Sequence, residues 1–197
     1  MVFWLIGINI LVFAAGELLG IRQTLVLRLS MIPVLVMNGQ VWTFVTYMFM
    51  HGGLAHLLFN MFGLFIFGTQ VERQMGSREF ILFYLVTGAL AGVLSFLIYL
   101  NAGTPFVALM GASGALYAVM LAYAVFFPDS IIYVWGILPL RAPTMVFGFV
   151  ALGLFMQLTG TGGNVAHLTH LAGFAFGWIY FVARFRISPW RRLTGRG

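Results

Sequence analysis

Five polar side chains that can do chemistry lie inside apolar segments of this 197-residue chain. His56 and Asn60 are four residues apart, so they share one face of a helix. Ser113 lies within a Gly-Ala-Ser-Gly sequence, and His167 and His170 follow near the C-terminal end. Because polar groups are costly to bury among apolar ones, each of the five is a candidate functional residue.

The composition limits the chemistry that these residues can do. The chain has no Cys, which excludes a cysteine nucleophile, a disulfide and a thiolate metal site. Its four acids are Glu17, Glu72, Glu79 and Asp129, and we expect the last three far from the histidines. Catalysis by paired carboxylates is therefore excluded, and a Ser–His pair remains. Only Glu17 is a candidate third member of a triad, so we favour a dyad.

Ser113 stands where a helix is predicted to begin. Free N–H groups and the helix dipole favour negative charge at such a position. An oxyanion formed during acyl transfer would be stabilised there. The side chains of His56 and Asn60 are candidate additional donors.

Structural explanations compete with these assignments. A serine or asparagine inside a membrane more often joins two helices by a hydrogen bond. His51, His56, His167 and His170 are also a conceivable zinc site. No acid is expected at their depth, so the general-base glutamate that accompanies catalytic zinc is missing. We therefore predict no metal.

The composition identifies the surroundings as a lipid bilayer. Of all residues 62% are hydrophobic and 7% are charged, and the mean hydropathy is +1.04; soluble domains are about 25% charged. A soluble enzyme, a disordered chain and a nucleic-acid binder are excluded. The net charge of +6 comes from ten Arg placed between apolar runs, so it reports membrane topology.

Six apolar runs are long enough to be read as membrane helices. They predict an all-α fold: one six-transmembrane-helix bundle over residues 1–197, with no soluble domain. The mixed segment 21–50 suits an interfacial position, and 101–110 and 129–141 are expected to be loops. The predicted spans are 2–19, 54–71, 80–100, 112–127, 144–158 and 165–183.

Six spans place both termini on one side of the membrane. Eight Arg fall on that side and two, Arg22 and Arg28, on the other, so we expect both termini in the cytoplasm. His56, Ser113 and His170 then lie at one depth, near the outer ends of their spans. The fourth span is only ~24 Å long against a hydrocarbon core of ~30 Å, which predicts a buried, water-reachable pocket at Ser113.

Small residues predict how two of these helices meet. Gly173 and Gly177 lie on or beside the His170 face of the sixth span, and Gly114 begins a strip of small residues on the fourth. Small-residue faces let membrane helices approach closely. This packing would bring His170 within reach of Ser113.

Taken together, these motifs resemble the rhomboid family of intramembrane serine proteases over nearly the whole chain. Their order and spacing, more than any one motif, carry the resemblance. The motifs are His-x-x-x-Asn at His56 and Asn60, Glu-x-x-x-Gly-Ser from Glu72 to Ser77, Gly-x-Ser-Gly from Gly111 to Gly114, and Ala-His-x-x-His-x-x-Gly-x-x-x-Gly from Ala166 to Gly177.

The resemblance implies a role for each matching residue. Ser113 corresponds to the nucleophile and His170, rather than His167, to the general base. The other matching positions support the oxyanion or the imidazole ring, and they are His56, Asn60, Gly111 and Tyr117.

The resemblance also implies a reaction and a setting. The reaction is hydrolysis of peptide bonds in or near the transmembrane helices of membrane-protein substrates, with no metal, cofactor or nucleic acid. Residues 21–52 resemble a first loop that dips into the membrane, and the fifth span with residues 159–166 resembles a gate and cap. Trp42 matches a Trp-Arg pair of that loop, but Thr43 replaces the Arg. We expect a multi-pass protein of a bacterial or archaeal plasma membrane.

Two other classes of function stay open. One is a catalytically inactive rhomboid-like protein that binds membrane proteins for quality control. The other is a metal-dependent membrane hydrolase or a channel. The sequence leaves open the substrate, the oligomeric state and the roles of His51 and His167.

Overall fold

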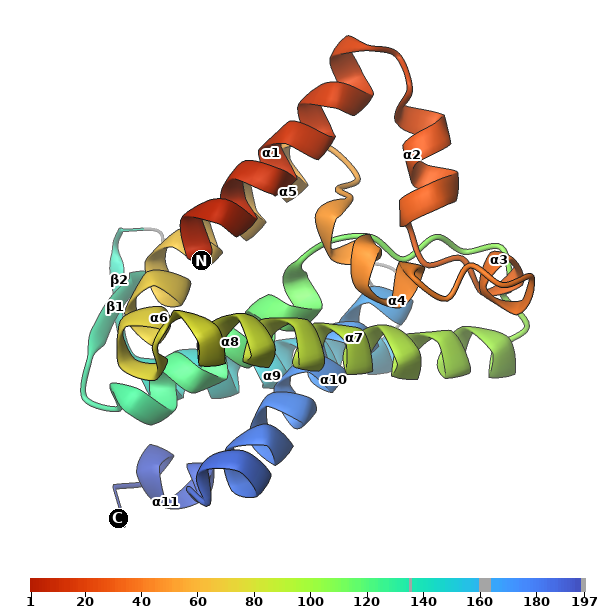
Figure 1. The fold of residues 1–197 in the computed structure, drawn as a ribbon. Helices are drawn as coiled ribbons and strands as arrows, with labels where there is room; N and C mark the ends of the chain where they lie inside the picture. The colour runs from red at the N-terminus through yellow and green to blue at the C-terminus, as the bar shows by residue number, and fades with distance from the viewer. Residues whose placement is uncertain (135, 160–163, 196–197) are drawn as a thin grey trace.

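The computed structural model describes residues 1–134, 136–159 and 164–195. It is mostly helical, with helices at the six predicted positions (Figure 1). These are α1 (Val2–Leu18), α5 to α6 (Leu54–Gly63 and Thr69–Met75, joined by the π-helical turn η2, Leu64–Gly68), α7 (Ser77–Asn101), α8 (Ser113–Phe126), α9 (Ala142–Thr159) and α10 (Asn164–Tyr180).

Among the described residues, three helices are long and apolar enough to cross a membrane. They are Leu54–Met75, Ser77–Asn101 and Ala142–Thr159, whereas α1 and α8 are shorter apolar helices. The chain is therefore an integral membrane protein.

A turn at Gly76 separates α6 from α7 and connects both to α1. Gly76 has φ +82°, a left-handed conformation that favours glycine. The carboxylate of Glu72 accepts hydrogen bonds from the Ser77 hydroxyl at 2.5 Å and from the Val2 N–H at 2.9 Å. The Glu-x-x-x-Gly-Ser motif thus fixes the start of α1 against this turn.

The connection from α1 to α5 is a series of short helical segments. They are α2 (Arg22–Leu29), α3 (Pro33–Met37), α4 (Thr43–Thr46) and the 3₁₀ turn η1 (Tyr47–Phe49). The Trp42 indole N–H donates to the Arg28 carbonyl at 2.9 Å, so Trp42 is bonded to α2. This bond forms although Thr43 stands in place of the Arg of the Trp-Arg pair. Tyr47 is fully buried, and its hydroxyl donates to the Gly88 carbonyl of α7 at 2.8 Å.

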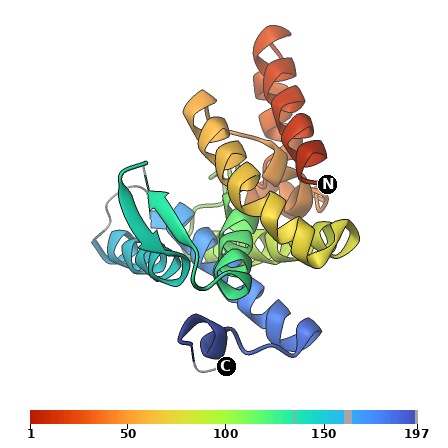
Figure 2. The same ribbon diagram turned by 90° about the vertical axis from the view of Figure 1, so that its left-hand side faces the viewer.

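The prediction of a plain loop at 129–141 is wrong. The segment forms an antiparallel hairpin of β1 (Ile131–Val134) and β2 (Leu138–Arg141), with Ile131 opposite Arg141. β-Branched residues in β1 favour an extended strand, and Gly136, at φ +71°, lies in the turn. Figure 2 shows the hairpin beside α9. The fold is therefore mostly, but not purely, helical.

The core is formed where α7, α8 and α10 pack together (Figure 1). Most of α8 is buried. The hydroxyls of Ser95 in α7 and Thr169 in α10 lie 2.7 Å apart in this core. At the other end of α7, Glu79 accepts a hydrogen bond from Tyr180 and a bidentate pair from Arg184 in the π-helical turn η3 (Phe181–Phe185).

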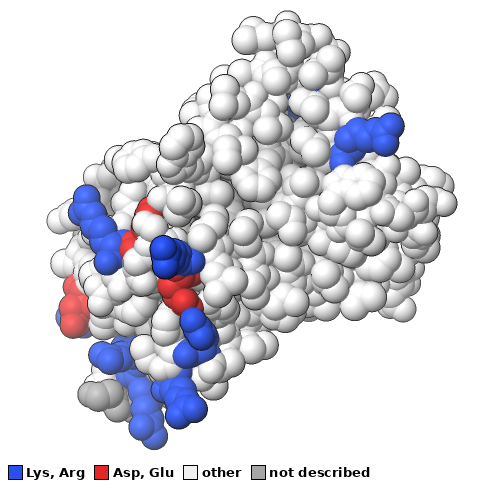
Figure 3. Space-filling view, in the orientation of Figure 1, with Lys and Arg blue, Asp and Glu red and all other residues white. Residues whose placement is uncertain are grey.

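The charged side chains gather at one end of the molecule. Figure 3 shows most of them where α6 and the last helix, α11 (Pro189–Leu193), lie, with a separate basic group near α2. The wide surface between these two ends is uncharged in this view, as expected for a surface that faces lipid.

Candidate active site

Ser113 and His170 form a hydrogen-bonded pair. The Nε2 atom of His170 lies 2.7 Å from Oγ of Ser113. Ser113 is the first residue of α8, and His170 lies in the first half of α10. Both residues are partly buried. The structure thus brings together the two residues for which the sequence predicted nucleophilic chemistry.

Two glycines allow the helices that carry this pair to touch. A Cβ atom at Gly173 would lie 1.8 Å from the Gly114 carbonyl oxygen, and one at Gly177 would lie 3.0 Å from Cβ of Ala118. The backbones of α8 and α10 are therefore in direct contact one turn from the Ser113–His170 pair. Gly114 and Ala118 on α8 and Gly173 and Gly177 on α10 are the small residues at this contact.

The ring of Tyr117 covers the imidazole of His170. The two rings are nearly parallel, at an angle of 10°, with centroids 4.5 Å apart. Tyr117 lies one turn after Ser113 on α8. The stacking restricts rotation of the His170 ring about its Cβ–Cγ bond.

His56 approaches Ser113 across Gly111. A Cβ atom at Gly111 would lie 2.7 Å from Nε2 of His56 and 3.7 Å from Oγ of Ser113. Only glycine fits here, and its φ of +121° is also one that other residues rarely adopt. The Gly111 N–H donates to the Tyr47 carbonyl at 3.0 Å, which fixes this segment to the buried η1 turn.

A backbone N–H determines which His56 nitrogen can donate. The N–H of Gly52 donates to Nδ1 of His56 at 3.3 Å. In a neutral imidazole the nitrogen that accepts cannot carry the proton, so Nε2 carries it. This Nε2–H donor lies on the side of the ring next to Gly111 and Ser113.

Asn60 is buried one turn below His56. Its side-chain NH₂ group donates to the His56 carbonyl at 2.8 Å, within the same helix. Its Oδ1 atom has no hydrogen-bond partner within the described ranges. One N–H of Asn60 is therefore used within helix α5.

Glu17 does not serve the dyad. Its carboxylate accepts a hydrogen bond from Arg22 at the start of α2. Across residues 1–134, 136–159 and 164–195, no carboxylate contacts the His170 ring. The arrangement is a Ser–His pair whose histidine is oriented by an aromatic ring.

Two pairs of histidine rings are neighbours. His51 and His56 have ring centroids 5.1 Å apart, and His167 and His170 have centroids 6.3 Å apart. In the part of the chain that the structure describes, no three His, Asp or Glu side chains gather in a way that suits a metal ion. Burial, and secondly the neighbouring His56, lower the pKa of His51 to about 4.

An apolar groove of about 220 Å³ lies beside the α5 helix that carries His56. It is formed by α5, η2, α8, the β-hairpin and α9. Side chains that line it include Phe62, Leu116, Met120, Tyr133, Met145 and Phe149. Much of the predicted cap at 159–166 lies outside the described residues.

Sequence reasoning missed the residues that act through the backbone. Tyr47 accepts from Gly111 through its carbonyl, and Gly52 donates to His56 through its N–H. Neither contact depends on a side-chain type that a motif would reveal. The one available signal was a tyrosine within the mixed segment before His56.

Comparison with known proteins finds a matching family model and several similar proteins. Residues 38–187 match the family model described as the rhomboid domain. Rhomboid protease GlpG of Haemophilus influenzae is 34% identical over 144 residues, which cover 72% of this chain and 71% of that protein.

Two other relatives are longer than this chain. RHOMBOID-like protein 12, mitochondrial, of Arabidopsis thaliana is 32% identical over 153 residues, 70% of this chain and 45% of that protein. Rhomboid protease GluP of Bacillus subtilis is 37% identical over 122 residues, 59% of this chain and 24% of that protein. The chain therefore spans less than half the length of these two.

Proposed function

Because the chain belongs to the rhomboid family, we propose that it is an intramembrane serine protease that hydrolyses peptide bonds in or near transmembrane helices. The observation that carries the proposal is the 2.7 Å contact between Nε2 of His170 and Oγ of Ser113. In this assignment Ser113 is the nucleophile and His170 is the general base.

The reaction proceeds in two halves. Nε2 of His170 takes the Ser113 proton while Oγ attacks the scissile carbonyl, and the protonated imidazole then gives that proton to the leaving amine. This leaves an acyl-enzyme ester on Ser113. A water molecule, deprotonated by His170, attacks the ester, and the proton returns to Ser113 as the new carboxyl group departs.

The negative charge of each tetrahedral intermediate is met by fixed donors. The Nε2–H of His56, the Ser113 N–H at the start of α8 and the second N–H of Asn60 are assigned to this role. Removing one such donor typically costs about 100- to 1,000-fold in kcat. Gly111 leaves the room that these donors need, because any side chain there would collide with His56.

We assign the chain six spans, and the charge distribution supports a topology with both termini in the cytoplasm. Most of the charged side chains lie at the end of the molecule near α6 and α11 (Figure 3), and cytoplasmic ends of membrane proteins are rich in Lys and Arg. Helix α8 has 14 residues, or ~21 Å, so Ser113 lies below the outer surface of a ~30 Å core. Residues 21–52 would then form the loop that dips into the membrane, in front of the site.

The substrate class follows from the same geometry. The apolar groove between α5 and α9 includes Phe59, about one helical turn after His56, and suits one side of an apolar helix. A peptide bond must leave its helix before it can reach Ser113, so substrates with small or helix-weakening residues near the cut should be preferred. The partners are transmembrane proteins and the bilayer itself, and no residue is assigned to a metal or cofactor.

The test is fluorophosphonate labelling combined with cleavage of a panel of transmembrane-segment substrates in detergent. Wild type should label and cleave, and Ser113→Ala should do neither while keeping its melting temperature. Ser188→Ala, at an exposed serine before α11, is the matched control and should behave as wild type.

Two results would reject the proposal in different ways. A wild-type protein that binds the substrates but neither labels nor cleaves them would be an inactive rhomboid-like binding protein. Loss of cleavage in EDTA that zinc restores would indicate a metal-dependent hydrolase.

A further inference from the structure

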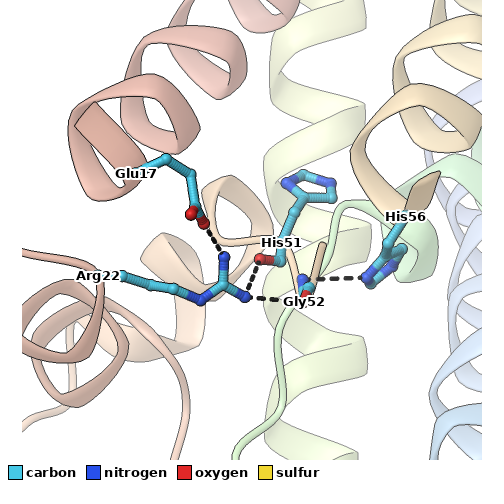
Figure 4. Close-up of polar contacts among 5 residues, drawn as sticks. All are labelled: Glu17, Arg22, His51, Gly52 and His56. Atoms are coloured by element: carbon cyan, nitrogen blue, oxygen red, sulfur yellow. Dashed lines mark hydrogen bonds and ion pairs between the residues drawn. The ribbon is translucent and has the colours of Figure 1, made fainter. Parts of the chain in front are cut away.

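An arginine outside the proposed dyad, Arg22, hydrogen-bonds to the backbone of residues 51–52, just before the helix that carries His56. Arg22 lies at the start of α2, and its guanidinium lies between Glu17 and the backbone at residues 51–52 (Figure 4). Nη1 donates to the Glu17 carboxylate. Nη2 donates to the Gly52 carbonyl at 2.7 Å and more weakly to the His51 carbonyl at 3.4 Å.

One peptide group, between His51 and Gly52, connects Arg22 to His56 by hydrogen bonds. The His51 carbonyl and the Gly52 N–H belong to the same peptide unit, and the described peptide bonds are all trans. In a trans peptide the C=O and N–H point in opposite directions. With the carbonyl turned to Arg22, the N–H points away from Arg22 to Nδ1 of His56, where it donates at 3.3 Å.

We propose that Arg22 is a positioning residue that, through the 51–52 backbone, holds the His56 ring with its Nε2–H facing Ser113. The inference rests on the proposed protease function for its kinetic consequence, but the orientation of His56 is a separate property. Without Arg22, the 51–52 backbone loses two hydrogen bonds, and the His56 ring can turn or move its proton to Nδ1.

Arg22 suits this role better than another cation would. Its planar fork allows one nitrogen to bind a carboxylate while the other binds a carbonyl. Residues 50–53 form no helix or strand, and the side chain that bonds the carbonyls of His51 and Gly52 is that of Arg22. The start of α2 is itself fixed, because Gly16 at the end of α1 packs against Arg22 without a side chain between them.

Glu17 has the smaller part. Both members of the Glu17–Arg22 pair are partly exposed, and exposed ion pairs contribute little stability. The carboxylate sets the direction of the guanidinium, whereas the bonds to the two carbonyls hold the backbone. Neutralising Glu17 should therefore weaken the hydrogen bonds of Arg22 to the two carbonyls without breaking them.

The kinetic experiment measures kcat and KM of the full protein in liposomes. Arg22→Ala should lower kcat by about 10-fold, a part of the ~100-fold expected for loss of one oxyanion donor, with KM changed less than about twofold. Arg22→Lys should recover part of the loss, and Glu17→Gln should lose less than Arg22→Ala. Arg28→Ala, the other arginine of α2 and exposed, is the control and should match wild type.

A double variant separates positioning from general damage. In a His56→Ala background, Arg22→Ala should cost nothing more, because the two residues act through one donor. An equal further loss of kcat in that background would overturn the proposal, since Arg22 would then act elsewhere.

A spectrum tests the orientation independently of catalysis. In protein labelled with ¹⁵N-histidine, the His56 signals of wild type should report a proton on Nε2. Arg22→Ala should shift them toward a mixture of both tautomers, and Arg28→Ala should not. Unchanged His56 signals in Arg22→Ala would overturn the proposal even in a protein that proves inactive, so its failure is distinguishable from failure of the protease assignment.

Discussion

Adding one methyl group at Gly173 should separate the two helices that carry Ser113 and His170. In Gly173→Ala the new Cβ would start 1.8 Å from the Gly114 carbonyl oxygen and 2.7 Å from its carbon. An ordinary C···O contact is about 3.3 Å or longer, so the backbones must move apart by about 1.5 Å. The contacting atoms are backbone, so no side chain can turn away to make room.

This displacement acts directly on the dyad. Ser113 precedes Gly114, and His170 lies one turn before Gly173. Half of the shift along the 2.7 Å bond between Nε2 and Oγ would stretch it to about 3.4 Å, beyond the usual range of a hydrogen bond. A misplacement of about 1 Å at a catalytic pair costs on the order of 100-fold in rate. Overpacking should also lower the free energy of unfolding by roughly 1–3 kcal/mol.

The assay compares three glycine-to-alanine variants by cleavage rate and melting temperature in detergent. Gly173→Ala should show the loss of rate, and Gly177→Ala a smaller one, because its Cβ would meet Ala118 at 3.0 Å. Gly148→Ala in α9, where a Cβ would meet nothing within 4 Å, is the control and should be no less stable than wild type. A Gly173→Ala protein as fast and as stable as wild type would refute the backbone contact and with it the way His170 reaches Ser113.

Three further predictions concern single aromatic or histidine rings. His170→Ala should be as damaging as Ser113→Ala and the double variant no worse, whereas His167→Ala should keep most activity; the reverse order in a cleavage assay would exchange their roles. Tyr117→Leu should lower kcat by about 10-fold, because the stacked ring at 4.5 Å is lost, and Tyr117→Phe should not; equal rates for the two would show that stacking is unimportant. Because burial lowers the pKa of His51 from 6.5 to about 4, the unfolded chain takes up the proton first as the pH falls, so stability should decline from about pH 6.5 toward pH 4. His51→Phe should show a shallower decline in melting temperature over that range, and an unchanged slope would contradict the assignment.

The helices were predictable because their signal is local. Each apolar run ends at a polar or helix-breaking residue, as at Gly76 or before Pro128, and the structure ends its helices within a few residues of those points. The spacing of Gly173 and Gly177 behind His170 was equally local. It indicated a close approach of helices without any knowledge of the fold.

The hairpin and the loop contacts were not predictable in the same way. In the segment of β1 and β2, two four-residue strands give too short a pattern to distinguish from a loop, and Pro139 argues against a strand. Glu17 was the only acid that the sequence left as a candidate third member of a triad, but Arg22, five residues later, binds its carboxylate. The contacts of Arg22 with the carbonyls at 51–52 are tertiary. They involve backbone atoms, so no residue type in that segment predicts them.

The three candidate spans are not equally embedded in the protein. In α9, 22% of the apolar stretch is buried inside the protein, against 44% for Leu54–Met75 and 39% for Ser77–Asn101. Acyl chains are as apolar as leucine, so a side chain of α9 that leaves its neighbours exchanges one hydrocarbon solvent for another at little free-energy cost. Separating α8 from α10 is different. Lipid chains cannot replace the close contact between their backbones at Gly114 and Gly173. Displacing α9 into lipid should therefore cost less free energy than separating α8 from α10. Helix α9 is also one of the elements that border the apolar groove.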